Sequence, residues 1–252
     1  MLTPASFHQT WRCALAIVPA LLLPGGSVSG DSSDVPTQAP PGVIVVSTEA
    51  SPLERLAGRE LRRYIYLSTG RLLPLLKADV LPEKPIRRIL LARKDTALVR
   101  SAPGGNSLAA AADSLGNEQF LLTTPSQGLA ENLWVVGGDD IGTLYGAYRL
   151  AEHFGVRYYL HGDVVPSQQS EFALPSLDER CQPLFKLRGI LPFHDFPEGP
   201  DWWDTDDYLA VIGQLPKLRM NFFGLHTYPE GKPNAEPTVW IEIGRASCRE
   251  RV

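Results

Sequence analysis

Apolar residues in the first half of the chain alternate between short strand-like runs and stripes with helical spacing. The run at 43–47 predicts a buried β-strand. After it, Ser51, Pro52 and Glu54 match an N-cap, a first-turn proline and the acid of a capping box, so a helix is predicted to begin there. Its apolar positions recur every three or four residues, and Gly70 is predicted to end it.

A second helical stripe and further apolar runs follow. The stripe is predicted to begin with Asp140 as N-cap and to end at Gly155. Gly138, Gly142 and Gly146 would give this helix a glycine face, which would let it lie close against a sheet. The predicted strands are 88–92, 119–123, 133–136 and 156–160, and residues 101–116 are predicted to form a loop or a weak helix.

Residues 185–230 have the order strand, helix, strand, with polar groups after each strand. The first apolar run begins at Phe185 and ends at His194 and Asp195. Residues 206–218 have helical spacing, and 220–225 form the second apolar run. Such units, with chemistry at the strand ends, are typical of a (β/α)8 barrel. Because a complete barrel needs roughly 250 residues, the sequence predicts only its beginning.

The predicted fold class is therefore α/β: a small domain with a mixed sheet and two helices, followed by the first βαβ unit of an incomplete (β/α)8 barrel. The last residues resemble the translation of a sequencing-adapter oligonucleotide and lack apolar periodicity, so we exclude them from the fold. The predicted segments are a signal peptide at 1–30, a linker at 31–42, the α/β domain at 43–166, a linker at 167–184, the barrel segment at 185–241 and the artefactual tail at 242–252.

The N-terminus has the three-part layout of a secretory signal. Arg12 precedes a short apolar run at 13–23, and small residues continue to Gly30. The run is shorter than the roughly 20 residues that span a bilayer, so a cleaved signal and a secreted or periplasmic protein are predicted, with an uncleaved anchor as the alternative. Of the 3 cysteines, only Cys181 lies outside the signal and the tail, which predicts no intramolecular disulfide.

Composition narrows the classes of partner. The chain is 44% hydrophobic and 21% charged, as ordinary globular domains are. Its formal net charge of −4, without an evident cluster of basic residues, gives no reason to expect nucleic acid or an anionic membrane as a partner.

Two polar motifs are interpreted as structural. Residues 137–140, Gly-Gly-Asp-Asp, lie between a strand and a helix, but the dinucleotide and P-loop fingerprints are missing and two aspartates would repel a phosphate. Helix capping is the favoured interpretation. The sequence His161-Gly-Asp163 predicts a turn, since further metal ligands are not suitably spaced. No cofactor and no metal are expected.

The candidate substrate contacts lie in the predicted barrel segment. The C-terminal ends of barrel strands face the active site, and exposed aromatic rings beside carboxylates and imidazoles suit a sugar ring. The alternative is that the tryptophans cover the barrel core and that the first histidine is a buried structural group. The residues singled out by this reasoning are His194, Asp195, Trp202, Trp203, His226, Tyr228 and Glu230.

This segment resembles the start of the barrel in family-20 hexosaminidases. The resemblance rests on Leu187-Arg-Gly-Ile190, on Asp195, on a helix that ends in residues 215–222 and on the strand that closes on Leu225-His226. It implies that Arg188 contacts sugar hydroxyls, and that the catalytic carboxylates lie on later barrel strands. No residue of this chain is therefore predicted to be catalytic.

The preceding domain is similar to the non-catalytic N-terminal domain that those hexosaminidases share with the family-67 α-glucuronidases. The similarity is clearest at 140–159, and the two resemblances together cover about 43–230. Residues 192–203 depart from the family-20 pattern, so the sugar is left open.

The predicted function is that of an N-terminal fragment of an exported glycoside hydrolase, hexosaminidase-like or α-glucuronidase-like, that acts on polysaccharides or oligosaccharides. The full-length protein is predicted to be an enzyme with a carbohydrate substrate, and the fragment to be inactive. Two alternatives stay open at this point: a non-catalytic carbohydrate-binding protein and, more weakly, a nucleotide-binding domain that uses residues 137–140.

Overall fold

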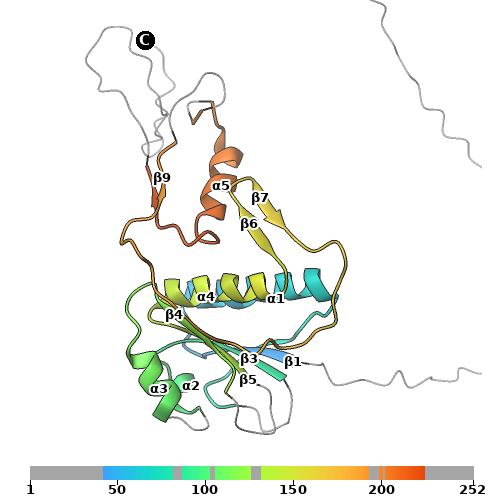
Figure 1. The fold of residues 1–252 in the computed structure, drawn as a ribbon, viewed down its shortest axis with the longest axis vertical. Helices are drawn as coiled ribbons and strands as arrows, with labels where there is room; N and C mark the ends of the chain where they lie inside the picture. The colour runs from blue at the N-terminus through green and yellow to red at the C-terminus, as the bar shows by residue number, and fades with distance from the viewer. Residues whose placement is uncertain are drawn as a thin grey trace, which may run out of the picture. The chain divides into compact units, whose positions relative to one another are not determined.

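The computed structural model describes residues 42–81, 87–102, 106–125, 132–192, 199–200 and 202–224. All of them belong to one compact unit, Ala39–Val252. The predicted signal segment, the linker that follows it and the C-terminal tail lie outside the described residues. The described part has a mixed α/β fold, which confirms the predicted class (Figure 1).

The core of the fold is a six-stranded sheet with the strand order β2-β1-β3-β5-β4-β8. The first four strands in this order are parallel, and β4 and β8 are antiparallel to their neighbours. The strands are β1 (Gly42–Val46), β2 (Leu75–Lys77), β3 (Arg87–Arg93), β4 (Phe120–Thr123), β5 (Asn132–Gly137) and β8 (Asp178–Cys181).

One face of this sheet is covered by α1 (Pro52–Thr69) and α4 (Asp140–His153), which lie side by side (Figure 1). Alternate strand residues such as Ile44, Ile89 and Val135 point toward these helices and are fully buried. Apolar positions of the two helices, including Leu61 and Leu150, complete this cluster. The helical stripes read from the sequence are thus the buried faces of α1 and α4.

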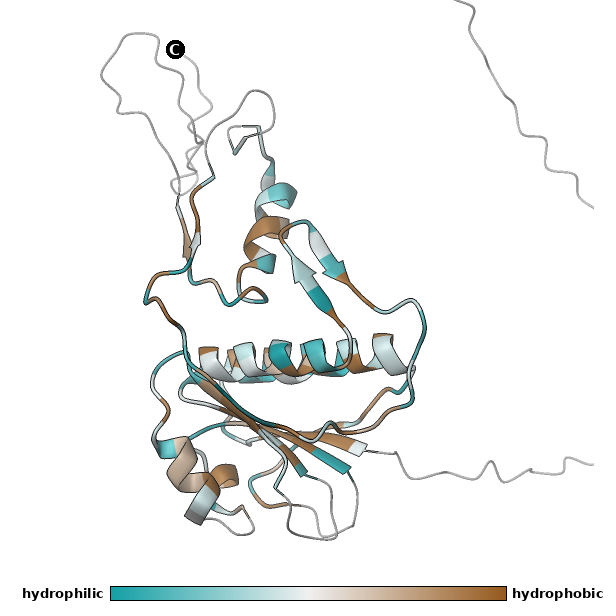
Figure 2. Cartoon of the chain, viewed as in Figure 1, coloured by the Kyte–Doolittle hydropathy of each residue, from teal (hydrophilic) through white to brown (hydrophobic). Residues whose placement is uncertain are grey.

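The other face is covered by two short helices, α2 (Ala97–Arg100) and α3 (Asn106–Asp113). The intervening strand residues, among them Val45 and Trp134, point to this side and pack with Leu98 of α2. Since both faces are buried, successive residues of the central strands are apolar, and Figure 2 colours these strands largely brown. The region predicted as a loop or weak helix at 101–116 contains α3, whereas α2 was not predicted.

The predicted start and end of α1 are confirmed. The Ser51 side chain accepts from the Glu54 amide, and the Glu54 carboxylate accepts from the Ser51 amide at 2.7 Å. Gly70 ends the helix with φ of 70°, a left-handed conformation that glycine adopts without strain.

The start of α4 differs by one residue from the prediction. Asp139, not Asp140, is the N-cap, because its carboxylate accepts from the Gly142 amide at 2.7 Å. The predicted close approach to the sheet is confirmed: a Cβ atom at Gly142 would lie 2.3 Å from the Gln119 carbonyl oxygen, and one at Gly146 would lie 2.8 Å from Val135.

Part of the predicted linker at 167–184 belongs to the sheet. Strand β8 pairs with β4, and Phe172 is buried against the same cluster as α1 and α4. Polar residues occupy much of β8, so its sequence lacks an apolar alternation, and it is the neighbouring edge of β4 that makes it a strand.

The remaining described elements continue toward the C-terminus. The predicted strand at 156–160 is shorter, and it forms a hairpin with a strand that was not predicted. The predicted strand, helix, strand unit is present, with its two short strands parallel to each other. These elements are β6 (Arg157–Tyr159), β7 (Gly162–Val164), β9 (Gly189–Ile190), α5 (Thr205–Gln214) and β10 (Phe222–Phe223).

Candidate functional site

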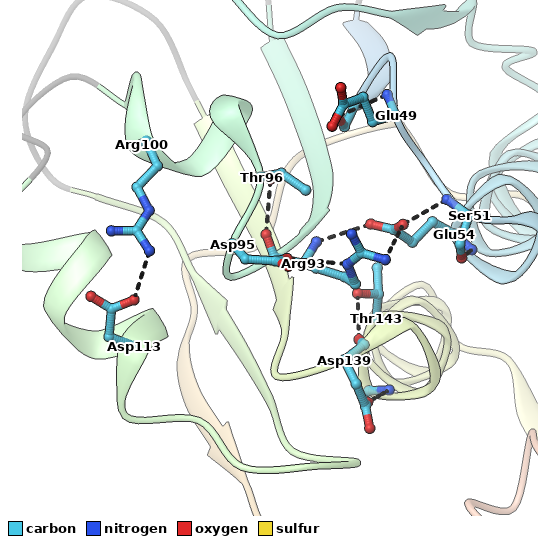
Figure 3. Close-up of polar contacts among 12 residues, drawn as sticks. Glu49, Ser51, Glu54, Arg93, Asp95, Thr96, Arg100, Asp113, Asp139 and Thr143 are labelled. Atoms are coloured by element: carbon cyan, nitrogen blue, oxygen red, sulfur yellow. Dashed lines mark hydrogen bonds and ion pairs between the residues drawn. The ribbon is translucent and has the colours of Figure 1, made fainter.

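The C-terminal edge of the parallel strands carries a polar cluster around Glu54 (Figure 3). The Glu54 side chain is fully buried, and its carboxylate accepts from the backbone amides of Ser51 and Arg93 at 2.7 and 3.0 Å. The Arg93 guanidinium lies 3.8 Å from the same carboxylate and donates to Asp95 at 3.1 Å. The contacts of Glu54 and Arg93 join α1 to the end of β3, and the Glu54 carboxylate is used by structural hydrogen bonds.

The turn at residues 137–140 is closed in the same way. The Asp139 carboxylate accepts from the amides of Gly142 and Glu118, and the Gly138 amide donates to the Gln119 carbonyl at 2.9 Å. A Cβ atom at Gly138 would lie 1.9 Å from the Gly116 carbonyl oxygen. A phosphate would meet the Asp139 carboxylate and the backbone that already lies close to Gly138, which supports the capping interpretation over nucleotide binding.

The unit β9-α5-β10 is the part of the structure that carries predicted substrate contacts. Arg188 immediately precedes β9, and Asn221 immediately precedes β10, so both lie at the N-terminal ends of two parallel strands. The Asn221 side chain accepts from the Arg188 amide at 3.0 Å and donates to the Lys186 carbonyl at 2.9 Å. These bonds hold the starts of the two strands in register.

Both residues bind one carboxylate of the first domain. Arg188 donates through Nη2 to Glu118 at 2.5 Å, and the Asn221 amide donates to Glu118 at 2.9 Å. Arg188 also donates through Nε to the Arg219 carbonyl and through Nη1 to the Phe185 carbonyl, at 2.8 and 2.7 Å. In this structure each guanidinium nitrogen of Arg188 thus has a partner within the protein, and its predicted sugar contact stays a prediction.

Two residues of this network have positive φ without being glycine. Glu118 has φ of 60° and Arg219 has φ of 58°. Left-handed backbone costs a residue with a Cβ atom about 1 kcal/mol, and it persists where surrounding contacts fix it. Here the conformation points the Glu118 carboxylate at Arg188 and the Arg219 carbonyl at the same guanidinium.

Two further ion pairs join the same segments. Lys217 donates to Asp163 at 2.9 Å, and Arg219 donates to Glu152 at 2.6 Å. In all three pairs the acid belongs to the first domain and the base to residues 185–224. We call this set the polar seam; its members are Glu118, Glu152 and Asp163 on one side and Arg188, Lys217 and Arg219 on the other.

The seam changes the acidity of two carboxyl groups. Partial burial acts to raise the pKa of Glu118, but hydrogen bonds from Asn221 and Arg188 outweigh it and hold the pKa below its usual value. For Asp163, burial acts to raise the pKa and is likewise outweighed, here by hydrogen bonds from Lys217 and from the Tyr64 hydroxyl, which donates at 2.6 Å. Both carboxylates therefore stay ionised at neutral pH.

The two predicted tryptophans have different surroundings. The Trp203 ring meets Tyr208 of α5 edge to face at 5.3 Å, and Tyr208 in turn meets Phe223 of β10 at 6.2 Å. Trp203 thus belongs to an aromatic row that links the loop, the helix and the strand. Trp202 is 58% exposed and presents more of its ring to solvent.

Comparison with known proteins finds a similar family for the first domain. Residues 28–150 match the family model described as the Glycosyl hydrolase family 67 N-terminus. This part of the chain is therefore similar to a glycoside hydrolase N-terminal domain. No curated protein sequence matches the chain.

Solved structures of glycoside hydrolases are similar to this chain. One, described as a novel family GH115 4-O-methyl-α-glucuronidase with specificity for decorated arabinogalactans, superposes with a TM-score of 0.52 at 18% identity, over 73% of this chain and 25% of that chain, and so agrees in fold. Another, described as a GH138 enzyme targeting pectin rhamnogalacturonan II, gives a TM-score of 0.44 at 17% identity, over 73% of this chain and 24% of that one. The chain thus spans about a quarter of the length of either structure.

The first domain supplies residues that sequence reasoning missed. Glu118 is preceded by a glycine-containing turn and looks like an ordinary surface acid in the sequence; nothing near it in the chain marks it as a partner of Arg188. Asp163 was interpreted only as part of a turn. Their partners lie 70 and 54 residues away, a separation that periodicity and local motifs do not reach.

Five predicted contacts fall outside the described residues, namely His194, Asp195, His226, Tyr228 and Glu230. Across the part of the chain that is described, no group of three or more histidine, cysteine or acidic residues could hold a metal ion. In the same part, no helix is long and apolar enough to cross a membrane. Cys181 is a free cysteine.

Proposed function

We propose that this chain is the N-terminal part of an exported, α-glucuronidase-like glycoside hydrolase that acts on polysaccharides or oligosaccharides. The observation that carries the proposal is the match of residues 28–150 to the N-terminus of glycosyl hydrolase family 67. The chain also covers only 25% of the α-glucuronidase that it resembles in fold, which supports the idea that further sequence follows.

The proposal extends to a (β/α)8 barrel that begins at β9. The parallel pair of β9 and β10, connected through α5, is one βαβ unit, and two strands cannot close a barrel. Apolar side chains of this unit are solvent-exposed, including Leu187, Leu191 and Leu209 at 63, 59 and 63%. Further βα units would cover such surfaces, because a barrel buries both the inner and the outer side of its strands.

The substrate site would lie at the C-terminal ends of β9 and β10. Barrel enzymes bind substrate at this end, whereas Arg188 and Asn221 hold the opposite end of the two strands. Trp202 follows β9 in the chain and would stack on a sugar ring, and the contact of Trp203 with Tyr208 of α5 would hold the loop that carries both tryptophans. His194, Asp195, His226, Tyr228 and Glu230 are proposed to complete the contacts.

The chemistry would use acids on later strands. Glycosidases need one carboxylic acid to protonate the leaving oxygen, and a second carboxylate or a substrate group on the opposite side of the sugar ring. We assign no such pair to this chain, so the 252-residue chain alone is expected to be inactive.

The test is to read the gene past codon 241 and to assay the complete protein on uronate-bearing and on N-acetylhexosamine-bearing oligosaccharides. We expect six more βα units with paired acids at strand ends, release of uronate, and loss of activity when either acid is replaced by its amide. Release of N-acetylhexosamine would instead favour a hexosaminidase. A complete protein that lacks these acids but is retained on a polysaccharide column would be a carbohydrate-binding protein and would contradict the proposal.

A further inference from the structure

The solvent-facing side of α1 carries four arginines within nine residues, Arg55, Arg59, Arg62 and Arg63. At 3.6 residues per turn they fall within a sector of about 100°, and Tyr66 lies in the middle of that sector. We call these four arginines together with Tyr66 the arginine stripe. Arg59, Arg63 and Tyr66 are exposed, Tyr66 to 48%, and the other two are half-buried. The four positive charges therefore lie on one face of α1. The overall composition of the chain does not reveal this clustering.

The stripe gathers several cations that have little compensation from carboxylates. Arg100, by contrast, is an exposed arginine that pairs with a carboxylate, Asp113, at 3.2 Å. Within the stripe, Arg55 donates to a backbone carbonyl, and Arg63 has a 3.5 Å contact with Glu60 and lies 5.0 Å from the centre of the Tyr64 ring. Arg59 and Arg62 have no ion pair or hydrogen bond to any residue that the structure describes.

This arrangement works against the helix itself. Arg59 has another arginine four residues before it and another four residues after it, and like charges at this spacing repel each other. The packing of α1 on the sheet and on α4 does not require them, because its buried side is formed by Ala57, Leu61 and Ile65. An anionic ligand would relieve the repulsion without disturbing the core.

We propose that the arginine stripe is a binding surface for a carboxylate-bearing polysaccharide, separate from the substrate site of the proposed barrel. A planar guanidinium pairs with a carboxylate through two parallel hydrogen bonds. The stripe from Arg55 to Tyr66 is about 16 Å long, so it matches a polymer with repeated carboxylates better than one small anion. The Tyr66 ring adds an apolar face against which a sugar ring packs.

The observations favour a polysaccharide over two other polyanions. A nucleic-acid-binding domain is usually strongly basic, whereas this chain has a formal net charge of −4 and a pI of about 5.8. A helix that lies on a membrane presents large apolar residues beside its cations, and the stripe presents Tyr66 alone. The choice of a polysaccharide rests on the proposed function.

The test is affinity electrophoresis of the 252-residue chain in gels that contain polygalacturonate or, for comparison, neutral dextran. We expect polygalacturonate to retard the protein and dextran not to do so. The double variant R59Q/R62Q should weaken binding to polygalacturonate about tenfold. Adding Y66A should weaken binding to polygalacturonate further, but should not change binding to polyglutamate. The variant R71Q/K77Q is the matched control, since it removes two exposed cations outside the stripe and should bind as the wild type does.

Absence of retardation for the wild type would overturn the proposal, as would equal losses in the stripe variant and in the control. Equal binding to polyglutamate, or stronger binding to phosphatidylglycerol vesicles, would also overturn it and would point to general polyanion or membrane attachment. Circular dichroism of each variant checks folding. This experiment measures binding and not hydrolysis. A chain that does not bind polygalacturonate therefore does not contradict the proposed enzyme function, and binding can still be measured if the complete protein proves to lack glycosidase activity.

Discussion

Glu118 connects two parts of the chain through a single side chain. Its carboxylate accepts from Arg188 and from Asn221, which precede different strands of the βαβ unit. Its backbone amide donates to Asp139, the N-cap of α4, so the same residue is also tied to the first domain. The positive φ of Glu118 is what allows both contacts at once.

At the residue scale we predict that Glu118→Gln lowers the free energy of unfolding by about 1–3 kcal/mol, because it leaves the largely buried Arg188 without its counter-ion. Urea unfolding followed by circular dichroism measures this. The control is Arg100→Gln, which breaks an ion pair whose side chains are 55 and 53% exposed and should cost at most about 1 kcal/mol. Equal effects of the two substitutions would show that the Glu118 contact is an ordinary surface pair.

The two long helices depend on different features at their starts. α1 begins with a complete capping box, which is recognisable in the sequence itself. The N-cap of α4 lies one residue before the predicted one, because the Asp139 side chain also reaches the amide of a distant residue, Glu118. The glycines of α4 then allow contact distances to the sheet that no Cβ atom would permit.

At the element scale we predict that Gly142→Ala destabilises the chain by about 1–3 kcal/mol, even though alanine favours helices over glycine by about 1 kcal/mol. The reason is that the new Cβ atom would lie 2.3 Å from a backbone oxygen of Gln119. Gly213→Ala in α5 is the control: nothing lies within 4 Å of its Cβ position, so it should be neutral or stabilising. Thermal unfolding of both variants compares them, and a stable Gly142→Ala variant would contradict the close approach.

At the scale of the whole chain, the first domain and the βαβ unit meet through matched charges. The buried apolar clusters lie almost entirely within the first domain, and α5 contributes no buried residue. Figure 1 shows α5 beside the β6–β7 hairpin, where Lys217 reaches Asp163. The polar seam therefore contributes much of what orders residues 185–224 in this chain.

We predict that acid weakens this arrangement. The pKa of Glu118 is lower in the folded chain than in the unfolded chain, so its contribution is fully present above the unfolded value, 4.5, and is lost as the pH falls through the folded value. The pKa of Asp163 is lowered in the same way relative to 3.8. Unfolding in urea at pH 7 and pH 3 should therefore show a smaller pH-dependent loss for Glu118→Gln than for the wild type. If the wild type and Glu118→Gln lose the same free energy of unfolding between pH 7 and pH 3, Glu118 does not contribute to the acid sensitivity.

The sequence by itself determined the fold class, both helix-forming stripes, the central strands and the strand, helix, strand order after Phe185, because each depends on local periodicity and on caps within a few residues. Only the tertiary structure decided that Asp178–Cys181 is a strand, that Asp139 is a cap and that Glu118, Arg188 and Asn221 meet. These three features depend on contacts with residues that are tens of positions away in the chain. The polar segments involved have no periodic pattern from which such contacts could be predicted. The resemblance to family-20 hexosaminidases implied that Arg188 contacts sugar, and the structure shows which protein groups Arg188 binds.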